Sequence, residues 1–219
     1  MPRTRCILIT GFGPFPGAPF NPTTSLVRHL ARLRRPALAD VRLVGHVFRT
    51  SYAAVDRELP ALLNEHRPDA VLMFGLASRS AAIRIEMQAR NALMARPDAG
   101  AVVPRSRQID AGGPQVRPGR APVSRLLQAA RACAIPADLS RDAGRYVCNY
   151  TYWRALESSD AGRQRLVVFV HVPPLRRAVR PAGKRRRGGP DSAALLASAT
   201  AILMALAAAL RRPVPRADR

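Results

Sequence analysis

The chain has 219 residues, enough for one domain with a sizeable core or for two small domains. Its hydrophobic content of 47% with 23% charged residues is typical of a globular protein and excludes a disordered basic tail. The formal net charge of +22 suggests nucleic acid or an anionic surface as a partner. However, Lys184 is the only lysine, so the charge is equally typical of an arginine-rich composition along the whole chain.

Apolar runs and amphipathic patterns alternate along the chain. Asn21 and Pro22 are typical of a helix start, with Asn21 as the N-cap. We expect strands at 6–10, 41–48, 70–75 and 166–172, and helices from 22, at 52–66, 122–133 and 148–157, with a last one capped by Asp191. Residues 83–94 are predicted to be extended but irregular, and residues 96–121 to form a long loop.

This alternation predicts the α/β class: a single three-layer α/β/α domain over 1–219, with a twisted, mostly parallel or mixed central sheet. Residues 193–210 carry no charge and reach the lower limit for a membrane span, but their large side chains recur on one helical face. We therefore predict a buried core helix and no membrane partner. The apolar run near residue 6 is too short for the core of a signal peptide. The three cysteines have no metal-ligand spacing and do not suggest a disulfide framework. Both observations favour a cytoplasmic protein that binds no metal.

A basic segment follows the strand at 166–172. Seven basic residues and no acidic residue lie between Arg176 and Arg187, within a glycine-containing loop at about 176–190. Such a run is typical either of an anion-binding patch or of a solvated insertion. Because no aromatic residue is interleaved, a base-stacking platform is excluded, and we favour the insertion. The tail at 211–219 is also basic.

A glycine-rich loop at 11–17 follows the first strand. It is not a dinucleotide-binding fingerprint, because Pro16 stands where the third glycine would be needed. The loop instead presents Phe12 and Phe15 beyond the carboxyl end of a strand, where ligands of α/β sheets bind. The alternative is that both rings belong to the core.

Cys148 is the first candidate for chemistry. It follows a small-residue turn at Ala143 and Gly144 and begins a predicted helix, whose N-terminus favours a thiolate. The alternative is an inert buried cysteine, which is how we interpret Cys6 and Cys133.

A thiolate nucleophile needs a base and a group that orients the base. His171 ends the strand at 166–172, at the sheet edge where catalytic groups gather; the alternative is a structural histidine. Glu86 is a rare glutamate that interrupts an apolar stretch and could orient the imidazole. The alternative is that Glu86 lies on the exposed face of an edge strand.

Together these segments resemble the pyroglutamyl-peptidase I (pyrrolidone-carboxylate peptidase) family of cysteine peptidases. The loop at 11–17 followed by Asn21-Pro22 resembles the family's opening, and Tyr146-Val147-Cys148-Asn149 resembles its nucleophile motif. Val170-His171-Val172-Pro173 resembles its histidine motif, and residues 68–75 resemble the strand before its glutamate. The resemblance covers residues 6 to about 210.

The resemblance implies a cofactor-free exopeptidase that removes N-terminal pyroglutamate from peptides through a thioester. It implies Cys148 as nucleophile, His171 as base and then acid, and Glu86 as the residue that orients the imidazole. Arg96, ten positions after Glu86, would hold the oxyanion with the backbone N–H of Cys148. The implied walls of the slot for the flat lactam ring are Phe12, Phe15, Tyr146 and Val147.

The chain departs from the family pattern at several places. Pro16 and Tyr150 replace a usual glycine and a common histidine, and one residue is missing between Arg96 and Pro97. Two alternatives therefore stay open: a family member with lost or altered activity, and a basic nucleic-acid-binding protein. We expect peptide substrates and no nucleic-acid partner, and we leave open whether the protein is a homo-oligomer.

Overall fold

The computed structural model describes residues 4–160, 164–176 and 189–211. Most of the predicted basic loop at 176–190 and nearly all of the tail at 211–219 lie outside these residues.

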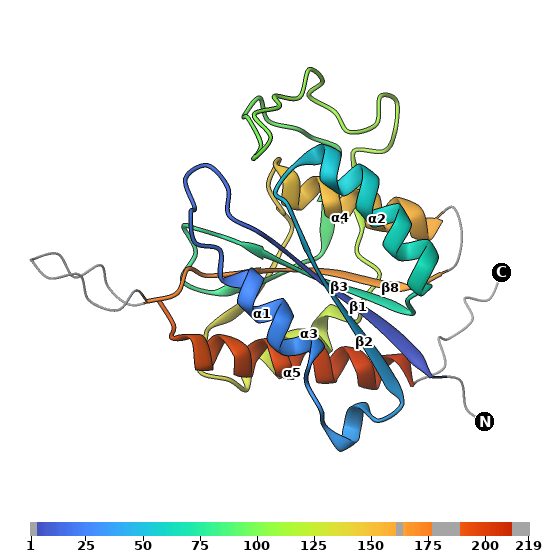
Figure 1. Ribbon diagram of the computed structural model, residues 1–219, viewed down its shortest axis with the longest axis vertical. Helices are drawn as coiled ribbons and strands as arrows, with labels where there is room; N and C mark the ends of the chain where they lie inside the picture. Colours follow the sequence, from blue (N-terminus) through green and yellow to red (C-terminus); the bar gives the residue numbers. More distant parts are fainter. Residues whose placement is uncertain (1–3, 161–163, 177–188, 212–219) are drawn as a thin grey trace, which may run out of the picture.

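A six-stranded mixed sheet forms the centre of the molecule (Figure 1). Its strands, in spatial order, are β2 (Val41–Phe48), β1 (Arg5–Phe12), β3 (Ala70–Leu76), β8 (Leu166–Val172), β4 (Ile83–Glu86) and β7 (Ala137–Ser140). Neighbouring strands from β2 to β8 are parallel, β4 is antiparallel to β8, and β7 is parallel to β4. The expected α/β class with a mostly parallel sheet is confirmed.

Helices cover both faces of this sheet (Figure 1). On one face lie α1 (Pro22–Ala31), α3 (Val123–Arg131) and α5 (Ser192–Leu210); on the other lie α2 (Tyr52–His66) and α4 (Val147–Asp160). A 3-10 turn, η1 (Pro36–Leu38), precedes β2. Each face holds its own hydrophobic cluster, because successive strand residues point to opposite sides: Ile7 and Ile9 face α1, whereas Leu8 faces α2 and α4.

Local signals explain where the helices begin. The Asn21 side chain accepts a hydrogen bond from the Thr23 N–H, and Pro22 occupies the first turn of α1, as predicted. The Asp191 side chain caps α5 through the Ala194 N–H. Within the described residues α5 alone has the length and composition to cross a membrane. Its large side chains nevertheless pack in the core beside α1 and α3, as expected for a core helix.

The structure refines the irregular middle of the chain. The segment predicted to be extended forms β4 and then β5 (Gln88–Arg90), which pairs in antiparallel fashion with β6 (Val116–Pro118). The short strand β7 was not predicted. Its burial pattern shows only the two end residues buried, so the sequence carries little apolar periodicity there.

Candidate active site

Cys148 lies in the first turn of α4, above the end of β3. Gly75 makes this approach possible, because a Cβ added there would lie 2.8 Å from the Cys148 Sγ and 2.8 Å from the Phe169 ring. The Cys148 side chain is partly exposed, whereas Cys6 is buried. The positive end of the α4 dipole therefore faces a reachable sulfur.

His171 and Glu86 lie side by side on neighbouring strands, on the face of the sheet that α4 covers. The Nδ1 of His171 donates to the Oε1 of Glu86 across 2.8 Å, and a side-chain hydrogen bond also links the imidazole to Cys148. Glu86 is fully buried between β8 and β7, so the alternative of an exposed edge-strand face is wrong. The three side chains predicted from separate motifs thus form one continuous chain of contacts.

Burial and hydrogen bonding act on His171 in opposite directions. Burial alone would lower the pKa of the imidazole, but the hydrogen bonds to Cys148 and Glu86 and the charges on those groups raise it to about 9. The protonated ring is therefore stabilised at neutral pH, beside a sulfur that can carry the matching negative charge. This arrangement is suited to nucleophilic catalysis by a thiolate–imidazolium pair.

Aromatic rings gather beside Cys148. The ring centroids of Phe15 and Tyr146 lie 6.1 Å apart, and Tyr52 meets the Tyr146 ring edge-on, also at 6.1 Å. Phe15 and Tyr146 are half-buried and form a rim. Tyr52 was not predicted from the sequence, and its buried hydroxyl has no hydrogen-bond partner among the described residues.

Two predicted slot residues lie deeper. Phe12 and Val147 are almost completely buried, and Phe12 packs against Phe169, which in turn packs against His171. These two side chains are part of the core beneath the site. Phe15 and Tyr146 therefore lie together at the surface, whereas Phe12 and Val147 are buried in the core.

Arg96 lies at the same rim. Its guanidinium lies over the Tyr146 ring at 5.5 Å, and its Nη2 donates to the Pro16 carbonyl across 3.0 Å. Among the described residues it makes no hydrogen bond to Cys148. Arg96 thus lies beside Tyr146 and is joined to the loop that carries Phe15.

Asn149 and Tyr152 of α4 support the site from below. The buried Asn149 amide accepts from the Arg90 N–H and donates to the carbonyls of Arg90 and Ala92, which ties α4 to β5. The Tyr152 hydroxyl donates to the backbone carbonyl of Glu86 across 3.1 Å. In the sequence, the Cys148-Asn149 pair pointed to the contact of Asn149 with β5. No sequence feature indicated the contact of Tyr152 with Glu86.

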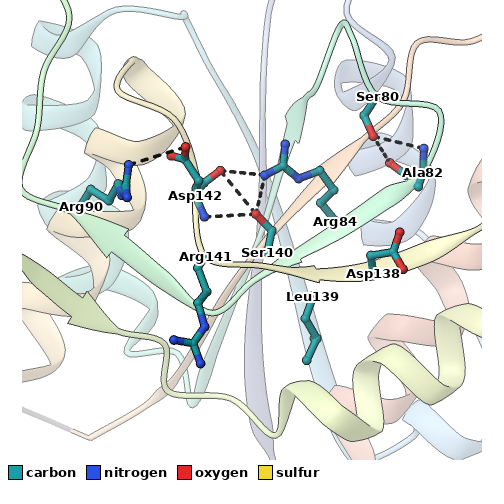
Figure 2. Close-up of a pocket in the computed structure, with 9 residues that line it drawn as sticks. All are labelled: Ser80, Ala82, Arg84, Arg90, Asp138, Leu139, Ser140, Arg141 and Asp142. Atoms are coloured by element: carbon teal, nitrogen blue, oxygen red, sulfur yellow. Dashed lines mark hydrogen bonds and ion pairs between the residues drawn. The ribbon is translucent and has the colours of Figure 1, made fainter.

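A pocket of about 400 Å³ opens beside β4 and β7, and Arg84 of β4 lines it. Figure 2 shows Arg84 and Arg90 pointing toward Asp142 from opposite sides. Arg84 donates to the Ser140 hydroxyl and to the Asp142 carbonyl, and Arg90 is paired with the Asp142 carboxylate at 3.6 Å. In the described parts of the chain, no group of three His, Cys, Asp or Glu side chains could hold a metal ion.

Known proteins resemble this chain in sequence and in fold. A family model described as pyroglutamyl peptidase matches residues 5–212. The pyrrolidone-carboxylate peptidase of Pyrococcus furiosus is 32% identical over 76% of this chain and 80% of that protein, and that of Gloeobacter violaceus is 33% identical over 81% and 86%. The solved pyrrolidone carboxyl peptidase of Thermococcus litoralis superposes with a TM-score of 0.84 at 27% identity, covering 96% of this chain and 99% of that one.

Proposed function

Because this chain belongs to the pyroglutamyl peptidase family of cysteine peptidases, we propose that it removes N-terminal pyroglutamate from peptides with Cys148, His171 and Glu86 as its catalytic residues. Its relatives are named for hydrolysis at pyrrolidone carboxylate, which supports the same exopeptidase reaction here. The observation that carries the residue assignment is the unbroken chain of contacts from Cys148 through His171 to a fully buried carboxylate.

The reaction begins at the sulfur. The Cys148 thiolate attacks the carbonyl carbon that joins pyroglutamate to the next residue, and the carbonyl π electrons move to the oxygen. The backbone N–H of Cys148 in the first turn of α4, together with Arg96, is proposed to stabilise this oxyanion. Arg96 would have to exchange its bond to the Pro16 carbonyl for this role.

His171 then carries the proton. The imidazolium protonates the leaving amine as the C–N bond breaks, which leaves a thioester on Cys148. A water molecule gives a proton to the neutral imidazole and attacks the thioester, and pyroglutamic acid and the thiolate are released. Glu86 keeps the Nδ1 proton in place throughout, so that the other nitrogen faces the sulfur.

The rings at the rim account for substrate choice. A neutral, flat lactam fits between half-buried aromatic walls such as Phe15 and Tyr146. A charged amino terminus would lose its hydration there without gaining a counter-ion, so ordinary peptides are excluded. Among the described residues, neither Cys133 nor Cys148 forms a disulfide, which supports our expectation of a reducing, cytoplasmic compartment.

The test is hydrolysis of a chromogenic pyroglutamyl amide. We expect Cys148→Ser and Cys148→Ala to abolish turnover, whereas Cys133→Ser, at a partly exposed cysteine on the opposite face, keeps wild-type rates. Iodoacetamide should inactivate the wild type and Cys133→Ser alike. Glu86→Gln should lower kcat more than it raises KM, because the carboxylate acts on the imidazole.

Two results would overturn the proposal. Full activity in Cys148→Ala would remove Cys148 as nucleophile. A folded wild-type protein that is alkylated at Cys148 but cleaves no pyroglutamyl amide would instead be a family member with altered activity.

A further inference from the structure

Arg84 is a charged side chain beside the proposed catalytic residues to which no role has yet been given. In the antiparallel pairing of β4 with β8, Arg84 lies directly opposite His171. Ile83 and Ile85 point into the hydrophobic cluster on the other face, so Arg84 and Glu86 share the face on which His171 lies. Directly opposite residues on one face have Cβ atoms only about 5 Å apart.

Arg84 and His171 approach the same carboxylate oxygen. The Nε of Arg84 lies 3.7 Å from the Oε1 of Glu86, and the Nδ1 of His171 lies 2.8 Å from that oxygen. Glu86 is fully buried, and its Oε2 has no hydrogen-bond partner among the described residues. A buried carboxylate is costly unless nearby positive charge compensates it, so Arg84 supplies part of that compensation.

The guanidinium is held in this place by neutral acceptors. Its Nη2 donates to the Ser140 hydroxyl and to the Asp142 carbonyl, both in the segment that leads from β7 toward α4 (Figure 2). The Asp142 carboxylate is engaged by Arg90 and by the Gly144 N–H. The positive charge of Arg84 is therefore left to act mainly on Glu86 and His171.

We propose that Arg84 is a positioning residue of the peptidase, which holds the Glu86 carboxylate toward His171 and limits how strongly that carboxylate attracts the imidazole proton. The proposal rests on the proposed function, since it assigns Arg84 a role through Glu86 and His171. Arg84 itself does not contact the reacting atoms.

The expected effect has a definite sign. Among the described residues, the charged and titratable groups that face His171 are Glu86 and Arg84 on β4 and Cys148 on α4, with Tyr152 of α4 against the Glu86 backbone. Removing the positive charge at Arg84 favours the protonated imidazole, so it raises the pKa of His171 above its already raised value. The alkaline limit of kcat/KM, where this proton is lost, then moves to higher pH by about half to one unit.

Arg84→Gln and Arg84→Met remove the charge with side chains of similar length. We expect either variant to show the upward shift of the alkaline limit and a kcat about tenfold lower at neutral pH, with KM near the wild-type value. Arg84→Lys should restore most of the kcat and the wild-type limit. The matched control is Arg90→Gln, which removes a positive charge from the same pocket and breaks the ion pair with Asp142, but changes no contact of Glu86.

The measurement is kcat and KM for a chromogenic pyroglutamyl amide between pH 5 and 10, with thermal unfolding of each variant as a check on folding. A folded neutral variant with the wild-type alkaline limit overturns the proposal, as does the same shift in Arg90→Gln. Neither result touches the proposed function, which fails only if Cys148→Ala remains active or the wild type is inactive.

Discussion

At Gly75 the absence of a side chain decides how closely Cys148 can approach the sheet. The Cys148 sulfur and the Phe169 ring both lie against Gly75, each 2.8 Å from the position that an added Cβ would take. Real Cβ atoms do not tolerate such distances, so a larger residue must displace one of these neighbours. Phe169 is fully buried and packed against Phe12 and His171, which leaves the sulfur as the neighbour that moves more easily.

We therefore predict that Gly75→Ala impairs both catalysis and stability. Displacement of the sulfur by about 1 Å should lower kcat/KM by about 100-fold. Overpacking should reduce the free energy of unfolding by about 1–3 kcal/mol. The two quantities are measured by pyroglutamyl-amide hydrolysis and by urea unfolding.

Gly13→Ala is the comparison, because an added Cβ there would meet only the Phe48 carbonyl, at 3.6 Å. This variant should keep most of its activity. Equal losses at both glycines would show that the close contact with Cys148 does not matter.

At the scale of elements, the loop after Arg96 is joined to the start of α2 by one carboxylate. Ser51, the N-cap residue of α2, makes no side-chain cap hydrogen bond. Asp98 takes that role: its Oδ2 accepts from the Tyr52 N–H, and its Oδ1 accepts from the N–H groups of Gly100 and Val102. Burial would raise the pKa of Asp98, but these hydrogen bonds outweigh it and hold the pKa below its ordinary value.

We predict that Asp98→Asn destabilises the protein by about 1–2 kcal/mol at pH 7. Because the pKa of Asp98 is lowered on folding, its ionised form stabilises the protein above the unfolded pKa of about 3.9, and this stabilisation disappears as the pH falls through the folded value. The difference between wild type and variant should therefore shrink below about pH 4. Urea unfolding at several pH values measures it.

Asp138→Asn, on β7, is the control for Asp98→Asn. Asp138 is exposed and makes a 3.4 Å ion pair with the exposed Arg131, so its loss should cost less than about 0.5 kcal/mol. A pH-independent difference for Asp98→Asn would contradict the role of its charge.

Elements with strong local signals were predictable. The sequence placed α2 at 52–66 and β8 at 166–172, and it predicted the Asn21 cap, because periodicity and capping act over a few residues. The candidate site was found through local motifs around Cys148 and His171 and through the rarity of glutamate. The resemblance joined these motifs before any geometry was known.

What the sequence could not predict depends on distant pairing. The direction of β4 is set by its partners β8 and β7, and the short β7 has almost no apolar pattern of its own. Asp98 caps a helix that begins 46 residues earlier in the chain. Arg84 became notable only when the register placed it opposite His171.

At the scale of the whole molecule, many arginines serve as structural cross-links. Arg117 lies over the Trp153 ring at 4.7 Å and pairs with Glu157 at 3.5 Å, and Arg154 also pairs with Glu157, at 2.8 Å. Arg5 and Arg211 both contact Asp40 and so join β1 to the end of α5. These contacts support our interpretation of the net charge of +22 as an arginine-rich composition, since the arginines pack as well as carry charge.

The antiparallel pairing of β4 with β8 also makes enzyme activity a reporter of folding. Glu86 and His171 are 85 residues apart in sequence, and they meet only in one register. A slip of one residue would turn Glu86 toward the opposite face of the sheet and separate it from the imidazole. Contacts of such long range form late, after the loop between them has closed.

Burial of the single tryptophan, Trp153, offers a second and independent signal during refolding. After dilution from urea, hydrolysis of a pyroglutamyl amide should return no earlier than the tryptophan fluorescence, and any chains trapped with β4 out of register should fluoresce as compact species while remaining inactive. Activity that precedes tryptophan burial would contradict this order. The recovered activity would thus measure only the fraction of molecules in which β4 pairs with β8 in the native register.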